Sequence, residues 1–375
     1  MKRQTNYMSL LCGAAAVILG GFMLLLAGGH KEKTSRLVIG TYGENIYAYS
    51  FNHEDAAFTL ESKAQARNAS YALPAEGQNI YAVSEIGAES GAYSFNMEEN
   101  GLAQTAYKQQ TGADPCFVLL YDGGKYMMTA DYSGGSISAF PIENGVIGNL
   151  CASLSFTGEG PDKSRQESSH IHQLKELPSQ NGKWILASDL GADVIRLAAF
   201  DGGNGTLNHI KDIPCPAGSG PRHLEFNEDY TILYCIAELS GEVLVYAISQ
   251  EDPIPSLNLI QQIQADEVNA RGSADIHIHP TGKWLYTSHR IDNDGISVFS
   301  ILPDGTLEKI GYTRTGRHPR NFMITDDGAY LLVACRDDKL VQVFRILPDG
   351  GLSLTESVLR FEDDMPSSIL LSKQL

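Results

Sequence analysis

The sequence predicts an all-β protein, a seven-bladed β-propeller built from four-stranded blades. Three observations lead to this fold class. A unit of apolar strands and polar turns recurs every 44 to 55 residues, the spacing typical of propeller blades. Stretches such as VLVYAI and ISVFSI alternate with period two, as strands do. The 375 residues include 37 glycines and 17 tyrosines, which suits strands joined by many tight turns.

The repeat is clearest in the second half of the chain. Three units run over 220–249, 274–307 and 318–352, each with an apolar strand, a Gly, Asp or Asn turn, a second strand and a third strand ending in Phe or Tyr. Looser copies begin near Asn68, Asp114 and Ser169. Six full units therefore precede residue 361.

The seventh blade is predicted to be split between the two ends of the chain. Residues 37–43, 46–51 and 58–63 supply three strands, and 366–372 resembles a first strand that lacks its continuation. Pairing the N- and C-terminal strands in one blade closes the ring and removes exposed sheet edges. Truncation at the C-terminus is therefore expected to destabilise the fold.

The N-terminus has the pattern of an export signal. Lys2 and Arg3 precede an uncharged run over 8–29, which is long enough to span a bilayer. Residues 1–30 are interpreted as a signal peptide or an N-terminal membrane anchor, and 36–375 as the propeller domain. The propeller is then expected outside the cytoplasm, periplasmic or membrane-anchored, with membrane contact only through this segment. The alternative is a start at Met8, which leaves the apolar run intact.

Composition limits the partners. A net charge of −17 argues against nucleic acid and anionic membrane surfaces, because both need a basic face. A few arginines can still form a local pocket for a small anion. The six cysteines form no CxxC pair, and Cys116, Cys235 and Cys335 lie in apolar strand patterns, which predicts buried free thiols.

The candidate site follows from blade geometry. The first strand of each blade lines the central channel, and the second strand is antiparallel to it. The start of strand one and the end of strand two therefore share one face of the ring, and polar residues gather there. Strand-one starts contribute His170, His172, Arg222, His223, Asp275, His277, Arg320 and Asn321. Strand-two ends contribute Glu85, Asp131, Asp189, Asp193, Glu238, His289, Arg290, Arg336 and Asp337.

Four stretches carry a resemblance to a known family. GPRHLEF, YCIAELSGEV, ADIHIHPTGKWLYTSHR and RHPRNFMITDDGAYLLVA, in this order and at blade spacing, resemble the propeller lactonases. That family includes propeller-type 6-phosphogluconolactonases and is similar to the fungal muconate lactonizing enzymes. The resemblance covers about residues 36–375.

The resemblance implies hydrolysis of a small-molecule sugar lactone, possibly phosphorylated, such as 6-phosphogluconolactone. It implies no metal and no cofactor. The family's candidate catalytic positions match His170, Arg222, Glu238 and Arg290, and candidate substrate-binding residues are His172, His223, Asp275 and Arg320.

The chemistry of these side chains agrees with such a reaction. Lactone hydrolysis needs a base for the attacking water and donors for the oxyanion that forms. His170 or Glu238 is a candidate base. Arg222 and Arg290 are candidates for binding the oxyanion or a phosphate, with Arg320 as a further phosphate ligand.

Structural roles compete with these functional ones. Arg222 is equally placed to form an inter-blade salt bridge with Glu238 or Asp275. His223, His277 and His279 are typical of histidines that hydrogen-bond to nearby turns. The His170–His172 pair lacks a third ligand at fixed spacing, so no metal site is expected. No glycine-rich phosphate loop and no G-x-S-x-G nucleophile motif occurs.

Two other functions remain open on sequence alone. An exported, non-catalytic propeller that binds a protein or carbohydrate is one, since propellers host both classes. A muconate-type lactonizing isomerase is the other, because its arginine clamp looks the same in sequence. A monomer is expected in each case, since a closed propeller leaves no sheet edge that needs a partner.

Overall fold

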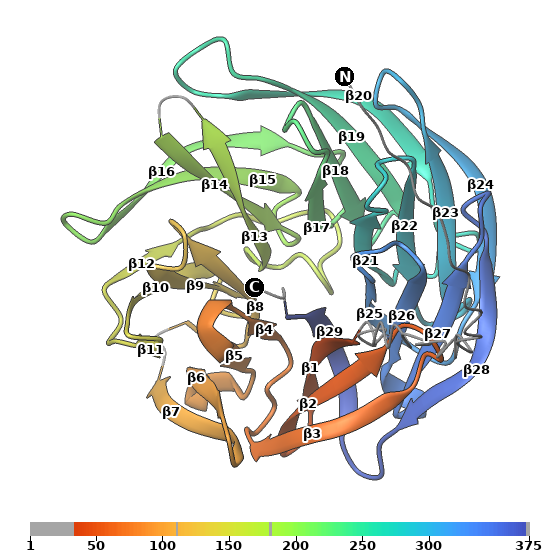
Figure 1. Ribbon diagram of the computed structural model, residues 1–375. Coiled ribbons are helices and arrows are strands. Elements are labelled where there is room, and N and C mark those ends of the chain that lie inside the picture. Colours follow the sequence, from red (N-terminus) through yellow and green to blue (C-terminus); the bar gives the residue numbers. More distant parts are fainter. Residues whose placement is uncertain (1–33, 110–111, 180–181, 373–375) are drawn as a thin grey trace, which may run out of the picture. The chain divides into compact units, whose positions relative to one another are not determined.

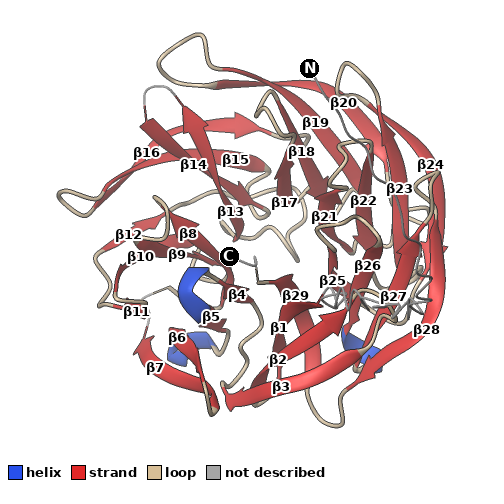
Figure 2. Ribbon diagram, viewed as in Figure 1, coloured by secondary structure: helices blue, strands red, loops and turns tan. Residues whose placement is uncertain are grey.

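The computed structural model describes residues 34–109, 112–179 and 182–372, which form a ring of seven β-sheets (Figure 1). Nearly every described element is a strand (Figure 2). The exceptions are three single-turn 3₁₀ helices, η1 (Glu76–Gln78), η2 (Gly87–Glu89) and η3 (Arg336–Asp338). The predicted seven-bladed propeller is confirmed. The predicted export segment, residues 1–30, lies outside the described residues.

Blades 1 to 3 are built from β1 to β12 and the C-terminal strand β29. Blade 1 has the order β29-β1-β2-β3, and its strands are β29 (Met365–Leu371), β1 (Thr34–Tyr42), β2 (Asn45–Asn52) and β3 (Phe58–Gln65). Blade 2 has β4 (Ala72–Pro74), β5 (Asn79–Ser84), β6 (Gly91–Glu98) and β7 (Gly101–Gln109). Blade 3 has β8 (Pro115–Tyr121), β9 (Tyr126–Asp131) and β10 (Ser136–Glu143), and its outer strand is divided into β11 (Val146–Ile147) and β12 (Ala152–Ser155).

Blades 4 to 7 each contain four consecutive strands. Blade 4 has β13 (Ile171–Ser179), β14 (Gly182–Asp189), β15 (Val194–Asp201) and β16 (Thr206–Pro214). Blade 5 has β17 (Pro221–Phe226), β18 (Ile232–Ala237), β19 (Glu242–Ser249) and β20 (Ser256–Gln264). Blade 6 has β21 (Ser273–Ile278), β22 (Trp284–His289), β23 (Gly295–Ile301) and β24 (Leu307–Arg314). Blade 7 has β25 (Pro319–Ile324), β26 (Tyr330–Cys335), β27 (Leu340–Ile346) and β28 (Leu352–Arg360).

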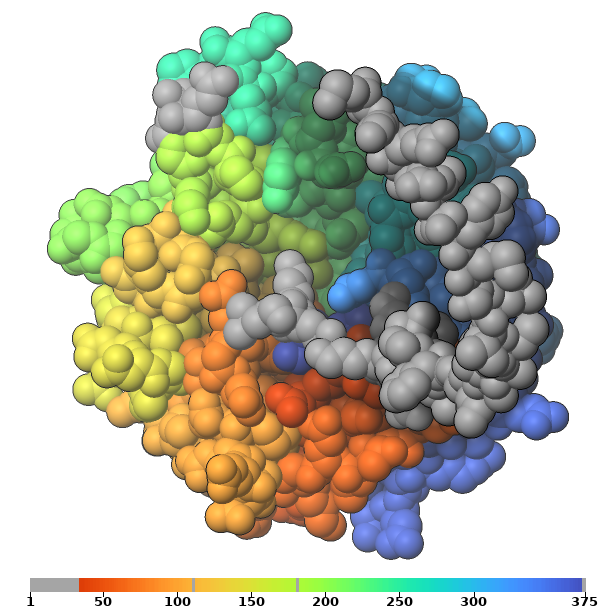
Figure 3. Space-filling view, viewed as in Figure 1, coloured from red at the N-terminus to blue at the C-terminus, as the bar shows by residue number. Residues whose placement is uncertain are grey.

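The ring closes through blade 1, as the sequence predicts. The C-terminal strand β29 pairs antiparallel with β1, with Ile39 opposite Ile369. In the space-filling view the red and orange N-terminal blades lie beside the blue C-terminal blade (Figure 3). Leu37 and Phe51 of blade 1 pack with Leu332 of blade 7 in a buried cluster, so the closing interface is as apolar as the others.

The core lies between the blades, and this explains why second strands read as unbroken apolar runs. In β18, Tyr234 and Ile236 face the cluster shared with blade 6, while Leu233 and Cys235 face the cluster shared with blade 4. Alternate side chains point to opposite faces of a sheet. Since both faces are covered, both sets are apolar. The predicted burial of the Cys235 thiol, and likewise of Cys116 and Cys335, is confirmed, and all three are free.

A tyrosine in the second strand fastens several blades to the next one. The Tyr81, Tyr234 and Tyr286 hydroxyls donate to the carbonyls of Gly145, Gly305 and Gly350, which lie in hairpin turns of the following blades. These glycines have φ of 80°, 82° and 85°, a conformation that favours glycine. The repeated Gly turns therefore shape a hairpin and also present an acceptor to the neighbouring blade.

Six of the seven innermost strands carry a β-bulge near their start. The ladder skips one residue in five of them and two in β21. The skipped residues are Cys116, His172, Arg222, Ala274 with Asp275, Arg320 and Ser367. In four of these strands the residue before the bulge is proline, which has no N–H for the ladder. A bulge re-aims a side chain, so this repeated irregularity decides what faces the channel.

Among the described residues, no helix is long and apolar enough to cross a membrane.

Candidate active site

A small cavity of about 10 Å³, enough for about one water molecule, lies on the channel axis. We call it the central cavity. Its lining residues are Ser70, Tyr71, Cys116, His172, Arg222, His223, Arg320, Asn321 and Ser367. Five of these nine are the single residues skipped by the bulges. The bulges therefore bring side chains from distant blades to one point, next to the face where inner strands begin and second strands end. We call this the site face.

Glu238 is the centre of charge on the site face. It follows the last residue of β18 and is 4% exposed. Its Oε2 lies 2.8 Å from Nε of Arg222 and 3.1 Å from Nη2 of Arg290. Its Oε1 accepts a hydrogen bond of 2.7 Å from Nη2 of Arg165. Three arginines from three parts of the chain thus share one buried carboxylate.

This arrangement keeps the Glu238 carboxylate ionised at neutral pH. Burial alone would raise its pKa, but the charges of Arg290, Arg222 and Arg165 outweigh burial and lower the pKa of Glu238 to about 2. A carboxylate with so low a pKa is a weak proton acceptor near neutral pH. Its chemistry is therefore to hold the arginines. The predicted salt bridge between Arg222 and Glu238 is present, but both residues belong to blade 5, so it does not join two blades as expected.

Arg320 is arranged differently from the arginines on Glu238. Within the described residues it makes no hydrogen bond or ion pair, and its guanidinium stacks 5.1 Å from the centre of the Tyr42 ring. The Tyr42 hydroxyl donates to Glu85 at 2.8 Å. Burial lowers the pKa of Arg320, but the nearby Tyr42 and Glu85 reverse that effect and raise it. Arg320 is thus a charged guanidinium whose N–H groups are available to a ligand.

His170 lies beside this group, between a backbone carbonyl and a carboxylate. Its ring stacks on Tyr132 at 4.4 Å between ring centres, and its Nδ1 lies 3.0 Å from the Tyr132 carbonyl. A carbonyl only accepts, so Nδ1 carries a proton. Nε2 faces the carboxylate of Glu167, 3.5 Å from its Oε1. Tyr132 also contacts Arg165, 3.5 Å from its hydroxyl, which links His170 to the cluster around Glu238.

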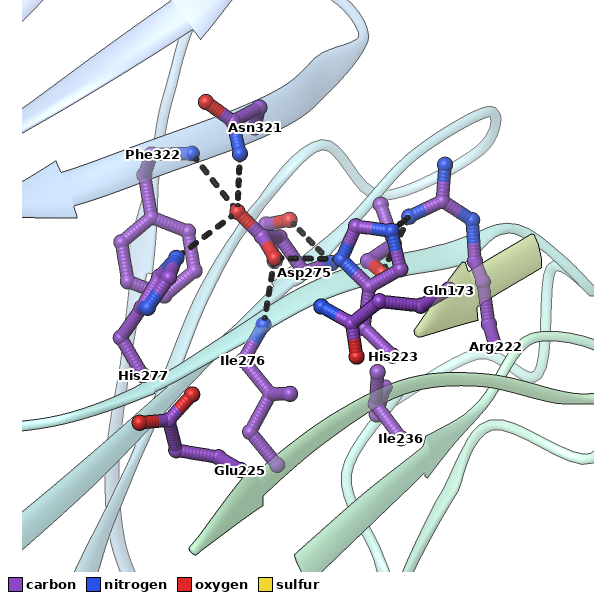
Figure 4. Close-up of polar contacts among 12 residues, drawn as sticks. Gln173, Arg222, His223, Glu225, Ile236, Asp275, Ile276, His277, Asn321 and Phe322 are labelled. Atoms are coloured by element: carbon purple, nitrogen blue, oxygen red, sulfur yellow. Dashed lines mark hydrogen bonds and ion pairs between the residues drawn. The ribbon is translucent and has the colours of Figure 1, made fainter. Parts of the chain in front are cut away.

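Asp275 forms a hub on the channel side of blades 5, 6 and 7 (Figure 4). Its carboxylate accepts from Nδ1 of His223 at 2.6 Å, from Nε2 of His277 at 3.0 Å and from Nδ2 of Asn321. The backbone N–H groups of Ile276 and Phe322 complete the shell at 3.0 and 3.2 Å. Burial would raise the pKa of Asp275, but His277 and His223 outweigh it and hold the pKa well below its usual value.

The two histidines deepest in the channel are neutral. Burial, followed by the charge of Arg222, lowers the pKa of His172 well below its usual value. The same two causes lower the pKa of His223 to about 4, although Asp275 opposes them. The Cys116 thiol lies 3.8 Å from Nδ1 of His172, and burial raises the pKa of Cys116 strongly. It is therefore not a thiolate nucleophile.

Four guanidinium groups, of Arg165, Arg222, Arg290 and Arg320, thus lie among the carboxylates of Glu238, Glu85, Glu167 and Asp275. Arg165, Arg222 and Arg290 share Glu238, whereas Arg320 makes no ion pair within the described residues. Among the described residues, no group of three or more His, Cys, Asp or Glu side chains is placed to hold a metal ion. This arrangement is suited to binding an anion or a developing oxyanion.

Comparison with known families decides the relationship. A family model described as a seven-bladed β-propeller lactonase matches residues 36–370. The chain belongs to this lactonase family. A 6-phosphogluconolactonase of Formosa agariphila is 32% identical over 318 residues, which is 81% of this chain and 88% of that relative.

Solved structures agree with this assignment. One from Bacteroides fragilis, provisionally assigned as a 6-phosphogluconolactonase, is 36% identical, covers 91% of this chain and 99% of its own, and has a TM-score of 0.84. The periplasmic gluconolactonase of Pseudomonas aeruginosa is 25% identical, with 90% and 99% covered and a TM-score of 0.81.

Three of the predicted strand-two residues do not face the channel of this lactonase-family propeller. Asp131 accepts from Ser136 and Ser138 of the third strand, Asp189 pairs with Arg196, and His289 contacts Ser273 and Thr287. Each is the last residue of its strand. Glu85, Glu238 and Arg290 come one position later and do reach the site face. Side chains along a strand point to opposite faces in turn. A shift of one position at the strand end therefore decides whether a side chain is used inside the blade or reaches the site face.

Arg165 belongs to this candidate site although no sequence pattern predicts it. It lies in the connection between β12 and β13, outside any strand pattern, so blade periodicity does not indicate it. Nearby contacts hold this segment in place: Nε2 of Gln166 donates to Asp193, and Arg271 pairs with Asp162. The only sequence signal is its position five residues before His170.

A much larger cavity, of about 990 Å³, opens at the other end of the channel. It is lined by strand-one ends and by the turns that follow them, for example Pro74, Lys125, His277, Ile324 and Leu371. Its walls are mainly apolar and it lacks the arginines of the site face. Cavity size alone therefore does not choose the candidate site in this lactonase-family chain, and we base the choice on the convergence of charged side chains.

Proposed function

We propose that this protein hydrolyses the ester bond of a sugar lactone, with 6-phosphogluconolactone as its substrate and 6-phosphogluconate as its product. The observation that carries the proposal is the arginine cluster of the site face, where Arg222 and Arg290 are fixed on Glu238 and Arg320 makes no ion pair among the described residues. The relatives named 6-phosphogluconolactonase support the choice of substrate.

The reaction needs a base, an oxyanion site and a proton for the leaving oxygen. We infer that Nε2 of His170 takes a proton from water as the water oxygen bonds to the lactone carbonyl carbon. Arg222 and Arg290 donate to the carbonyl oxygen as it becomes negative. The ring C–O bond then breaks, and the imidazolium of His170 returns its proton to the departing oxygen. The carboxylic acid product loses one proton to water at neutral pH.

Arg320 is proposed to bind the phosphate. A guanidinium binds phosphate oxygens in bidentate fashion, and that of Arg320 is not engaged by a carboxylate. His172, His223 and Asp275 lie deeper in the channel, so we infer that they shape and support the site and do not react.

The cellular location is part of the proposal. We infer that residues 1–30 export or anchor the chain and that the propeller acts, as a monomer, outside the cytoplasm. The likeness to a periplasmic gluconolactonase supports this inference. Cell fractionation that finds the full-length chain in the cytosol would contradict it.

The test is hydrolysis of 6-phosphogluconolactone and of unphosphorylated gluconolactone by the full-length protein in mild detergent, without metal and corrected for spontaneous opening. We expect turnover of both, with kcat/KM higher for the phosphorylated lactone. Turnover of neither would contradict the proposal and favour a binding propeller.

A further inference from the structure

The orientation of Arg222 is set by three neighbours. Nη1 contacts two acceptors, Nε2 of His223 at 3.3 Å and the carbonyl of Ala274. Nε forms an ion pair with Glu238 at 2.8 Å, but this contact does not have the geometry of a hydrogen bond. No partner for Nη2 occurs among the described residues. The guanidinium is thus held along one edge, and the N–H groups of Nη2 remain for a ligand.

The contact between Arg222 and His223 depends on one tautomer. Nη1 of arginine only donates, so Nε2 of His223 must be unprotonated to accept from it. Nδ1 lies 2.6 Å from Asp275, whose ionised carboxylate only accepts, so Nδ1 carries the proton. Asp275 therefore selects the tautomer that presents a lone pair to Arg222. Figure 4 shows His223 between these two side chains.

The negative charge of Asp275 is stabilised by donors from its own strand and from the next blade. His277 and Asn321 donate to its second oxygen from β21 and β25, together with the backbone N–H of Phe322. Asn321 in turn accepts from the N–H of Ile369 in β29. The ionised state of Asp275 is thus fixed by contacts that run from blade 5 to blade 1.

We propose that Asp275 and His223 are positioning residues for Arg222, forming a chain in which the carboxylate fixes the imidazole tautomer and the imidazole fixes the guanidinium. The role resembles that of a carboxylate behind a catalytic histidine, except that the group held is an arginine. The tests of this inference that measure enzyme activity rest on the proposed lactonase function.

The contact between His223 and Arg222 in this positioning chain is expected to break at acid pH. The titratable and charged groups around His223 are Arg222 on its own strand, Asp275 and His277 on β21, and His172 on β13, whose ring centre lies 5.2 Å away. Protonation of Nε2 would place N–H groups opposite one another and break the contact with Arg222. The pKa of His223, about 4, puts this event at moderately acid pH.

Two substitutions of His223 separate the two contacts of the positioning chain, the one with Asp275 and the one with Arg222. In His223→Gln, the side-chain oxygen can reach the position of Nε2 and accept from Arg222, but the contact with Asp275 is lost. In His223→Asn, the amide can reach the position of Nδ1 and donate to Asp275, but nothing accepts from Arg222. We expect kcat of His223→Gln to stay within about tenfold of wild type and kcat of His223→Asn to fall about 100-fold.

The pH profile adds a readout that a structural role would not change. Compared with His223→Gln, the wild type should lose additional rate as pH drops through about 4, because only the wild type has a His223 that becomes protonated there. Equal losses in both variants, or the reverse order, at unchanged thermal midpoints would overturn the proposal.

A second measurement is independent of turnover. In the full-length protein with ¹⁵N-labelled histidine, the signals absent from His223→Gln belong to His223. We expect an unprotonated Nε2 at pH 7 that becomes protonated near pH 4. A protonated Nε2 at pH 7 would overturn the positioning chain even if the protein is an active lactonase. The expected tautomer in a protein without lactonase activity would instead reject only the proposed function.

Discussion

The inner strands of blades 5 and 7 begin in the same way. Each has proline, then arginine in a bulge, then a side chain that donates to Asp275: Pro221-Arg222-His223 in one and Pro319-Arg320-Asn321 in the other. Blade 6 lies between them and supplies the shared carboxylate. The same backbone device therefore brings both arginines to the central cavity.

The two arginines differ in what surrounds them. Arg222 is held by Glu238, His223 and a backbone carbonyl, whereas the one side-chain contact of the Arg320 guanidinium among the described residues is the face of Tyr42. A fixed guanidinium is suited to a charge that develops during the reaction, because its orientation costs no reorganisation then. A guanidinium with unused N–H groups is suited to a charge that the substrate already carries. The comparison supports the proposal that Arg222 acts in catalysis and Arg320 in recognition.

The largest expected effect is the loss of Arg222. Arg222→Lys keeps the charge but cannot contact Glu238, His223 and the Ala274 carbonyl together, so kcat should fall about 100-fold or more. The matched control is Arg317→Lys, at a surface residue paired with Asp338, which should leave kcat unchanged. Near-normal kcat in Arg222→Lys, measured with 6-phosphogluconolactone, would remove the distinction between the two arginines.

The second effect concerns stability in acid. The pKa of Glu238 falls from 4.5 to about 2 on folding, so the ionised carboxylate stabilises the fold by about 3 kcal/mol above pH 4.5. That stabilisation is lost as pH falls from 4.5 through 2. Urea unfolding should therefore show a large gap between wild type and Glu238→Gln at pH 6 and a smaller one at pH 3. A gap independent of pH would show that the Glu238 charge does not hold the arginines.

The third effect is on recognition. Arg320→Gln removes a guanidinium that holds no carboxylate, so the fold and kcat should change little. KM for 6-phosphogluconolactone should rise about tenfold, the effect of losing about 1.4 kcal/mol of binding. Steady-state kinetics would count against the assignment if kcat fell while KM stayed the same.

The smallest effect is expected at Arg165. Its side chain is 37% exposed, so solvent screens its interaction with Glu238, which keeps Arg222 and Arg290 as partners. Arg165→Gln should raise KM about threefold, with the difference shrinking at high salt. Lys163→Gln, in the same connection and 64% exposed, is the control and should behave as wild type. A larger loss than in Arg320→Gln would reverse the proposed order.

Much of this arrangement follows from the sequence. Repeat spacing predicts the ring, and the split repeat predicts the pairing of β29 with β1. The polar residues at strand starts predict which face carries the site. The recurrent proline before Cys116, Arg222, Arg320 and Ser367 is a further signal, since a residue without an N–H favours a bulge in the ladder.

Other features of the candidate site depend on contacts between distant residues, which local sequence patterns do not predict. One residue of register separates Asp189, which pairs inside its own blade, from side chains that reach the channel. Arg165 arrives from an irregular connection whose path is set by distant partners. The sharing of Asp275 by His223 and Asn321 joins three blades, and local patterns in one blade carry no information about it.

The preference for the phosphorylated lactone, measured as the ratio of kcat/KM for 6-phosphogluconolactone to that for gluconolactone, distinguishes the two arginines most sharply. We expect wild type and Arg222→Lys to share a high ratio, although Arg222→Lys is slow on both substrates, and we expect the ratio to drop about tenfold in Arg320→Gln. A ratio that is unchanged in Arg320→Gln, or that collapses in Arg222→Lys, would contradict the division between the fixed and the free arginine.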